Sequence, residues 1–296
     1  MVRRYKNIRS LRRYVRNRFA ALAAAATAFV IFFLGCNSDF PGFFVSSALD
    51  DRLKERDNFV FLAANNWKTL ELGGDYSFIV VTDIHILNGE TYGFEGLKAV
   101  IEDPVNNVRF LVVLGDITQN GSRSDLGLFI DIAVNRFGIP CYPVIGNHDL
   151  YSGGWRVWRE LIGSTSYRID GGTVTLLIMD SANMFLGREQ MNRLEMELRT
   201  AAGRVFVFTH ANFFTTNIED PQQMTDMNER ARVTSILRDK CDAMFMGHVH
   251  EWYTNDIGNV KYITVDAFHA AVNTNKSYCL VRVSGSDIRY EYKRLP

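Results

Sequence analysis

Proline is scarce in this sequence, with six residues among 296, and no internal repeat or low-complexity stretch is present. These absences exclude a fibrous, low-complexity or disordered protein. The balance of apolar and charged residues is that of a folded globular chain. The length allows one large domain or two small ones.

Cysteine is scarce as well, with four residues. One of them, Cys36, belongs to an N-terminal segment discussed below. The other three, Cys141, Cys241 and Cys279, cannot all pair with one another, and each lies in or beside an apolar run. We therefore expect buried free thiols at these three positions.

An excess of basic charge is missing from the main part of the chain. The formal net charge is zero, but eight basic residues and no acidic residue precede Cys36. The rest of the chain carries 25 basic and 33 acidic side chains, a net charge of −8. A nucleic-acid-binding domain needs basic charge on its folded surface, so we expect no nucleic-acid binding.

The first 35 residues have the pattern of a secretory signal peptide. A basic stretch leads into the apolar segment 20–34, in which only Thr27 is polar. A membrane-spanning helix needs about 20 apolar residues, so this segment is short for one. A basic region, a short apolar region and a small residue at the end are typical of a signal peptide. The alternative is an uncleaved membrane anchor.

The end of this segment, Leu34-Gly35-Cys36, resembles the bacterial lipobox, although Phe33 stands where Leu is usual. The resemblance implies a lipid on Cys36 and a lipoprotein anchored to a membrane of the bacterial cell envelope. If the segment is an uncleaved anchor, Cys36 is there by accident. We expect residues 36–74 to form the lipid anchor and a tether, and residues 75–296 to form the folded domain.

Strand and helix patterns alternate through this domain. Compact apolar runs indicate buried strands, and runs with one apolar face indicate helices. The alternation implies βαβ units in an α/β body, and the tail without helices after residue 252 implies a second sheet or an extended mixed one. The expected strands are 76–82, 110–114, 141–145, 166–169, 173–179, 204–209, 243–246, 252–256, 261–265, 277–283 and 287–292, and the expected helices are 94–102, 126–137, 155–162, 187–201 and 226–240.

Polar residues follow five of the buried strands. In α/β sheets the carboxyl ends of the strands are where sites assemble. Five of the six histidines lie at these ends, and only His269 does not. Charged groups and imidazoles in such places need partners, because burying them alone is costly. The five segments are Asp83-Ile84-His85, Gly115-Asp116, Gly146-Asn147-His148-Asp149, His210 and Gly247-His248-Val249-His250.

These side chains have the chemistry of metal ligands. Imidazole suits Zn²⁺ or Fe, and carboxylate suits Mn²⁺ or Mg²⁺. Alternate residues of an extended segment point the same way. Asp83 with His85, and His248 with His250, are therefore each expected to present two ligands to one centre. An ordinary polar cluster at a loop-lined sheet edge is the alternative.

The five segments, in this order, resemble the signature of the metallophosphoesterase superfamily, the calcineurin-like phosphoesterases. The resemblance runs from Asp83 to His250. It implies an α/β fold, a four-layer α/β/β/α sandwich of two mixed sheets packed face to face. It also implies two transition-metal ions (Mn, Zn or Fe) that together activate water and neutralise charge on a phosphoryl group. The implied ligands are Asp83, His85 and His250 for the first ion, Asn147, His210 and His248 for the second, and Asp116 as a bridge.

The resemblance also implies a catalytic role for His148, which would bind the phosphoryl group and protonate the leaving oxygen. Serine/threonine phosphatases of the superfamily carry an Asp and an Arg where this chain has Gln119 and Asn120. The Asp would keep the imidazole charged, and the Arg would grip a phosphate dianion. Their absence argues against a protein phosphatase, favours the phosphodiesterases and the lipid or nucleotide phosphoesterases, and weakens the proton-donor role of His148.

His269 and several aromatic residues near these segments each allow two interpretations. His269 is expected to be a core or loop histidine, with a reach into the site as the alternative. The aromatic residues are expected to belong to the core, with an apolar rim for a lipid or a base as the alternative. They are Tyr151, Trp155, Trp158, Phe213, Phe214, Trp252 and Tyr253.

We therefore expect dinuclear-metal-dependent hydrolysis of phosphoric esters. The enzyme would be a phosphodiesterase or phosphomonoesterase of the cell envelope, acting on a small-molecule or lipid phosphate ester. The competing expectation is a non-catalytic, envelope-anchored metal-binding interaction module on the same fold. Because every ligand position of the signature is filled, the enzyme is favoured. The sequence leaves the substrate, the metals and the oligomeric state open.

Overall fold

A computed structural model describes residues 48–91, 93–214, 226–269 and 276–295. The expected signal peptide, the lipidation site Cys36 and the tether up to residue 47 lie outside these residues. Within the described ranges, no helix is both long and apolar enough to cross a lipid bilayer.

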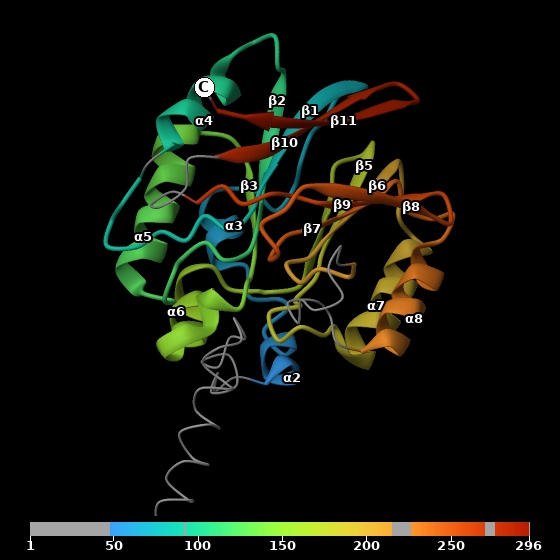
Figure 1. Ribbon diagram of the computed structural model, residues 1–296, viewed down its shortest axis with the longest axis horizontal. Helices are drawn as coiled ribbons and strands as arrows, with labels where there is room; N and C mark the ends of the chain where they lie inside the picture. Colours follow the sequence, from blue (N-terminus) through green and yellow to red (C-terminus); the bar gives the residue numbers. More distant parts are fainter. Residues whose placement is uncertain (1–47, 92, 215–225, 270–275, 296) are drawn as a thin grey trace, which may run out of the picture. The chain divides into compact units, whose positions relative to one another are not determined.

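Two mixed sheets carry the fold (Figure 1). The strands are β1 (Asp75–Val81), β2 (Val108–Leu114), β3 (Cys141–Val144), β4 (Tyr167–Asp170), β5 (Val174–Ile178), β6 (Arg204–Phe208), β7 (Ala243–Met246), β8 (Tyr253–Ile257), β9 (Val260–Thr264), β10 (Ser277–Ser284) and β11 (Asp287–Arg294). Their order is β11-β10-β1-β2-β3 in the first sheet and β4-β5-β6-β7-β9-β8 in the second. The C-terminal strands do not form a sheet of their own: β8 and β9 extend the second sheet, and β10 and β11 extend the first.

The helices cover the outer faces of the sheets (Figure 1). The first sheet has α4 (Phe94–Glu102), α5 (Arg123–Asp131) and α6 (Gly154–Leu161) on its side, and the second sheet has α7 (Gly187–Leu198) and α8 (Met227–Leu237). The expected helix 126–137 is α5 continued by a π-helical turn, η2 (Ile132–Phe137), and a 3₁₀ turn, η3 (His148–Gly153), precedes α6. The four-layer α/β/β/α sandwich is thereby confirmed.

Side-chain alternation along the strands separates two apolar layers. In β6, Phe206 and Phe208 face the first sheet, while Val205 and Val207 pack with residues of α7 and α8. The ring of Phe78 in β1 lies 5.1 Å from that of Phe206, so aromatic contacts join the two sheets. Because successive strand residues point to opposite faces, the same strand can serve both layers.

Residues 48–74, which were expected to belong to the lipid anchor and tether at 36–74, pack on the folded domain. Two short helices, α2 (Leu49–Leu53) and α3 (Val60–Ala64), bury apolar side chains on it. The guanidinium of Arg52 is fully buried and makes two hydrogen bonds to Asp180, of 2.7 and 2.8 Å. Residues 48–74 pack because their apolar side chains and this arginine have partners in the domain.

The three cysteines of the domain are free and buried, as predicted. Burial raises the pKa of each thiol far above its ordinary value. These thiols therefore stay protonated at neutral pH and act as small apolar core residues.

Candidate metal centre

The candidate site lies where the loops after the parallel strands meet. Strands β1, β2 and β3 are parallel to one another, as are β6, β7 and β9. A hydrogen bond joins loops from the two sheets: the amide of His248, which follows β7, donates to Oδ2 of Asp83, which follows β1, over 2.9 Å. The sandwich thus brings all five sequence segments to one place.

The backbone at the site differs from the extended conformation that the sequence suggested. Asp83 and His85 both have φ of 51°, and His248 and His250 have 73° and 54°, in the left-handed region. Such a conformation costs a non-glycine residue about 1–3 kcal/mol, and it persists only where surrounding contacts hold it. Here, the amides of Asp83 and His85 donate to the carbonyls of Gly115 and Asp116 over 3.1 and 2.9 Å. Asp83 and His85 therefore lie together because of these contacts, not because of strand alternation.

The first group of candidate ligands comprises Asp83, His85 and His250. Asp83 Oδ1 lies 3.1 Å from His250 Nε2 and 3.7 Å from His85 Nε2. Asp116 Oδ2 faces the same space, 3.9 Å from His85 Nε2. Asp83 and Asp116 thus each present an oxygen to His85 Nε2, and His85 and His250 belong to a group of imidazoles close enough to one another to hold a metal ion.

The second group comprises Asn147, His210 and His248. The Nε2 atom of His210 lies 3.0 Å from Asn147 Oδ1, 3.2 Å from His248 Nδ1 and 3.2 Å from Asp116 Oδ2. The Nδ1–H of His210 donates to the carbonyl of Leu114 over 2.7 Å, which leaves the lone pair of Nε2 for the site. One carboxylate oxygen, Asp116 Oδ2, thus lies between the two groups.

The electrostatics couple the carboxylates to the imidazoles. Burial opposes ionisation of Asp83 and Asp116, yet the neighbouring His250 and His210 hold the pKa of each carboxyl well below its usual range. Conversely, burial disfavours the charged imidazole of His210, but Asp116 raises its pKa to about 10. Against the effect of burial, Asp83 likewise raises the pKa of His250, so without a metal the site favours protonated imidazoles at His210 and His250. A metal ion would release these protons, because metal-bound imidazole is deprotonated at the ligating nitrogen.

The two ring nitrogens of His85 indicate that the donor set suits a metal pair. Among the described residues, neither ring nitrogen of His85 has a hydrogen-bond partner, and both are buried. A buried polar atom without a partner costs about 1–3 kcal/mol. A cation held by His85 Nε2, Asp83 and Asp116 would remove that cost for Nε2. The residues therefore fit two transition-metal ions in chemistry and in grouping.

Close approach explains why glycine precedes the site residues in the motifs. A Cβ on Gly146 would overlap Asp116 Oδ1 and the Asp116 amide nitrogen. A Cβ on Gly247 would overlap Thr82 Oγ1 and lie 2.9 Å from Asp83 Oδ2. Only glycine lets the loops approach these carboxylates closely enough.

His148 lies at the rim of both groups. Its amide donates to Asp116 Oδ1 over 2.8 Å, and its ring meets that of His85 edge-on at 4.6 Å. Its Nδ1 lies 2.9 Å from the backbone carbonyl of Gln119. Gln119, at the position where the serine/threonine phosphatases carry an aspartate, thus still contacts His148. The contact is made by its neutral backbone carbonyl and not by a carboxylate.

Asp149 also lies at the site, although no role was predicted for it. Its carboxylate accepts hydrogen bonds from the amides of Thr118 and Gly146, of 2.9 and 3.0 Å, and from the Thr118 hydroxyl. Burial and the charge of Asp116 raise its pKa to about 6. It joins the loops after β2 and β3, and its place in the motif next to His148 was the only signal for it.

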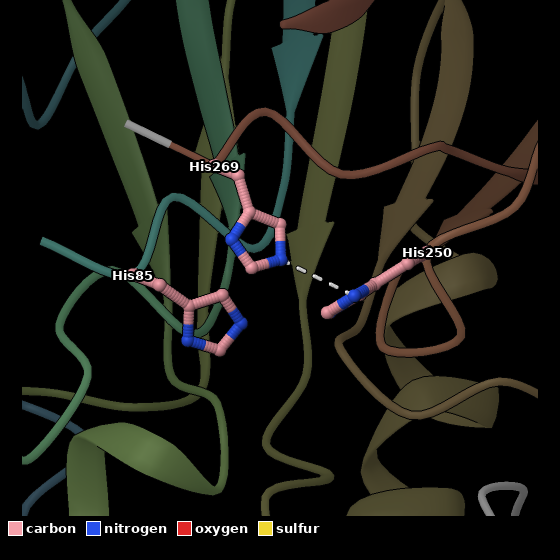
Figure 2. Close-up of side chains that lie close together, drawn as sticks. All are labelled: His85, His250 and His269. Atoms are coloured by element: carbon pink, nitrogen blue, oxygen red, sulfur yellow. Dashed lines mark hydrogen bonds between the residues drawn. The ribbon is translucent and has the colours of Figure 1, made fainter. Parts of the chain in front are cut away.

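His269 lies in the site, contrary to the favoured expectation. Its Nε2 is 3.3 Å from His250 Nδ1, and its ring stacks on that of His85 at 4.7 Å (Figure 2). Burial and the two neighbouring imidazoles lower its pKa to about 4. The sequence did show that His269 follows a predicted strand, at 261–265. It did not show that this strand, β9, is parallel to β7, which is what brings its carboxyl end to the site.

The aromatic residues near the motifs belong largely to the core, as favoured. Trp158 and Phe213 are completely buried. Trp155, Trp252 and Phe214 are partly buried against the two apolar clusters. Few of these aromatic side chains are therefore available to form an apolar rim around the site.

Comparisons with solved structures show the fold. A dimetal phosphatase from Danio rerio has 14% identity and a TM-score of 0.60, over 76% of this chain and 98% of that one. A purple acid phosphatase from yellow lupin (Lupinus luteus) seeds has 13% identity and a TM-score of 0.60, over 75% and 52%. GAP50, described as the anchor in the inner membrane complex of Plasmodium, has 13% identity and a TM-score of 0.57, over 75% and 85%.

A search of curated protein sequences finds no match. The family described as calcineurin-like phosphoesterase matches residues 76–252, which contain all five motif segments. This match covers more than half of the sequence. The chain therefore belongs to the calcineurin-like phosphoesterase family.

Proposed function

We propose that the chain hydrolyses phosphoric esters at a centre of two transition-metal ions. The proposal is carried by one observation: Asp116 Oδ2 lies between two groups of donor side chains, 3.2 Å from His210 Nε2 and 3.9 Å from His85 Nε2. The first ion would be held by Asp83, His85 and His250. The second ion would be held by Asn147, His210 and His248, and Asp116 would serve both ions.

When bound, the two ions supply Lewis acidity that activates water and neutralises charge on the phosphoryl oxygens. The chain's own residues supply positioning. The Gln119 carbonyl orients the ring of His148 through Nδ1. His148 Nε2 would then contact the phosphoryl group and the leaving oxygen. Asp149 fixes the loop that carries His148 and Asn147.

The proposed substrate is a small-molecule or lipid phosphate ester, as a diester or a monoester. The absence of an arginine at Asn120, which is exposed, supports a substrate other than a phosphoprotein. An arginine there would grip a phosphate dianion with two hydrogen bonds. The acidic domain supports the expectation that nucleic acid is not a substrate.

A panel assay tests the activity. The purified chain, loaded with Mn²⁺, Zn²⁺ or Fe, is offered aryl and alkyl phosphate monoesters and diesters, and metal content is measured in parallel. We expect about two ions per chain and turnover of at least one ester class. If protein holding both ions hydrolyses none of them, the interaction module becomes the better explanation, and the fold shared with GAP50 is consistent with it.

The role of His148 is tested by His148→Ala. Turnover should fall by about 10²–10⁴, the usual scale for a positioned proton donor. The fall should be larger for alkyl esters than for aryl esters, because only a poor leaving group needs the proton. Metal content should stay near that of the wild type. An equal fall for all leaving groups would limit His148 to hydrogen bonding, and unchanged rates would remove it from catalysis.

The proposed location is a membrane of the bacterial cell envelope, reached through lipid on Cys36. Stable anchoring takes more than one acyl chain, which bacterial lipoproteins have. The mature chain should sediment with membranes, and Cys36→Ser should release it. If Cys36→Ser still sediments and retains its first 35 residues, the segment is a plain anchor.

A further inference from the structure

The loop after β9 holds an imidazole against two candidate ligands of the first group. The amides of Phe268 and His269 donate to the carbonyls of Thr82 and Asp83 over 2.8 and 2.9 Å. These bonds fix the end of β9 on the loop that follows β1, in the other sheet. His269 has φ of 40°, an uncommon conformation for a residue with a side chain. Tertiary contacts therefore define the position of this ring.

The ring of His269 touches both imidazoles of the first group (Figure 2). It stacks on His85, with ring centres 4.7 Å apart and planes 29° apart. It meets His250 edge-on, at 4.7 Å and 85°, so that its Nε2 lies 3.3 Å from His250 Nδ1. The other nitrogen of His250, Nε2, lies 3.1 Å from Asp83 Oδ1. His269 thus contacts His250 on the side away from the carboxylate.

We propose that His269 is a positioning residue of the first metal site, which accepts the Nδ1–H of His250 on its own Nε2 and stacks on His85. This inference rests on the proposed metal centre. In the absence of a metal, His250 Nε2 donates its proton to Asp83 Oδ1. With a metal bound, the hydrogen bond from Nδ1 to His269 would fix the tautomer of His250 and leave the lone pair of Nε2 for the ion. The stacking restricts rotation of the His85 ring, which has no hydrogen bond to restrict it among the described residues.

The direction of the hydrogen bond follows from the chemistry of the pair. A neutral imidazole has one donor nitrogen and one acceptor nitrogen. A metal-ligating histidine uses one nitrogen for the metal and donates from the other, usually to a carboxylate, a carbonyl or a water. In this chain the acceptor is a third histidine. Loss of such a partner typically lowers metal affinity about 10–100-fold.

Two substitutions of His269 separate the hydrogen bond from the stacking. His269→Phe keeps a flat ring over His85 and removes the acceptor. His269→Gln keeps an acceptor oxygen and removes the ring. The matched control is His148→Phe, which also removes an imidazole in edge contact with His85 but does not touch the His250 hydrogen bond. Each variant is stripped of metal, and its thermal unfolding is compared with that of the stripped wild type.

Calorimetric titration with Mn²⁺ then measures the two binding steps, and the electron paramagnetic resonance of the bound Mn²⁺ reports on the ligand environment. We expect His269→Phe to weaken one of the two steps about 10–100-fold and leave the other unchanged. His269→Gln should recover most of that loss, and His148→Phe should bind both ions as the wild type does.

Other outcomes overturn the proposal. Unchanged binding by His269→Phe removes the positioning role. Equal losses in His269→Phe and His269→Gln mean that the accepted hydrogen bond is not what matters, and they favour His269 as a direct ligand. A wild type that binds no metal pair refutes the proposed function instead, so the two failures are distinguishable. A stripped variant that unfolds well below the stripped wild type also counts against a role limited to metal binding.

Discussion

The buried contact between Arg52 and Asp180 makes the segment before β1 part of the folded domain. Both side chains have no exposed surface. Arg52 Nε and Nη2 donate to the two oxygens of Asp180 over 2.7 and 2.8 Å, and Nη2 also donates to Asn183 over 2.7 Å. Replacing Arg52 by methionine keeps much of the volume but leaves a buried carboxylate without its cation.

The expected cost of Arg52→Met is large. Removing one partner of a buried ion pair typically costs about 3–5 kcal/mol, because the remaining charge stays buried and uncompensated. At about 2–4 °C per kcal/mol for a domain of this size, the midpoint of thermal unfolding should fall by about 6–20 °C. The double variant Arg52→Met/Asp180→Asn should recover a substantial part of the loss, since it removes the stranded charge as well.

Urea and thermal unfolding of the wild type, both single variants and the double variant measure this coupling. Lys54→Met is the matched control, because Lys54 lies in the same segment and its ion pair with Asp51 is exposed. It should unfold as the wild type does. If Arg52→Met unfolds within about 1 kcal/mol of the wild type, a value near the average for any substitution, the segment is not held by this contact and the reasoning is refuted.

Three further predictions concern the candidate metal centre. Gly146→Ala should abolish binding of the metal pair, because its Cβ would displace Asp116, and metal content measured beside circular dichroism would show whether the fold survives. Asp116→Asn should lower metal content more than substitution of any other single candidate ligand, since its carboxylate faces both groups; an equal loss in His85→Ala would contradict this. The stripped protein should lose stability as pH rises from about 6.5 toward about 10, because His210 has a raised pKa in the folded state and its contribution is complete only below its ordinary pKa. Urea midpoints across this pH range test that loss, which saturating metal should remove, and a flat profile in the stripped protein would refute the coupling to Asp116.

The sequence by itself determined the family pattern and much of the fold. The order of the five motif segments, and the apolar runs before them, placed Asp83, Asp116 and His210 at strand ends correctly. Local patterns sufficed there, because a buried parallel strand is a continuous apolar run and its end is marked by the first polar residues. The free, buried state of the three cysteines also followed from their apolar neighbours.

Only the tertiary structure decided which strands share a sheet and how the loops approach each other. His269 enters the site because β9 lies parallel to β7, and strand pairing between distant segments leaves no local signal in one sequence. Arg52 lies in the segment 36–74 that was expected to form the tether, and a charged residue is normally exposed. It is buried because Asp180, 128 positions later, compensates its charge. The left-handed backbone at Asp83 and His85 is likewise held by carbonyls of another loop. Local sequence determines whether a segment forms a strand or a helix. Contacts between distant segments determine whether a charged group can be buried or a strained backbone conformation can persist, because those contacts supply the compensating partner.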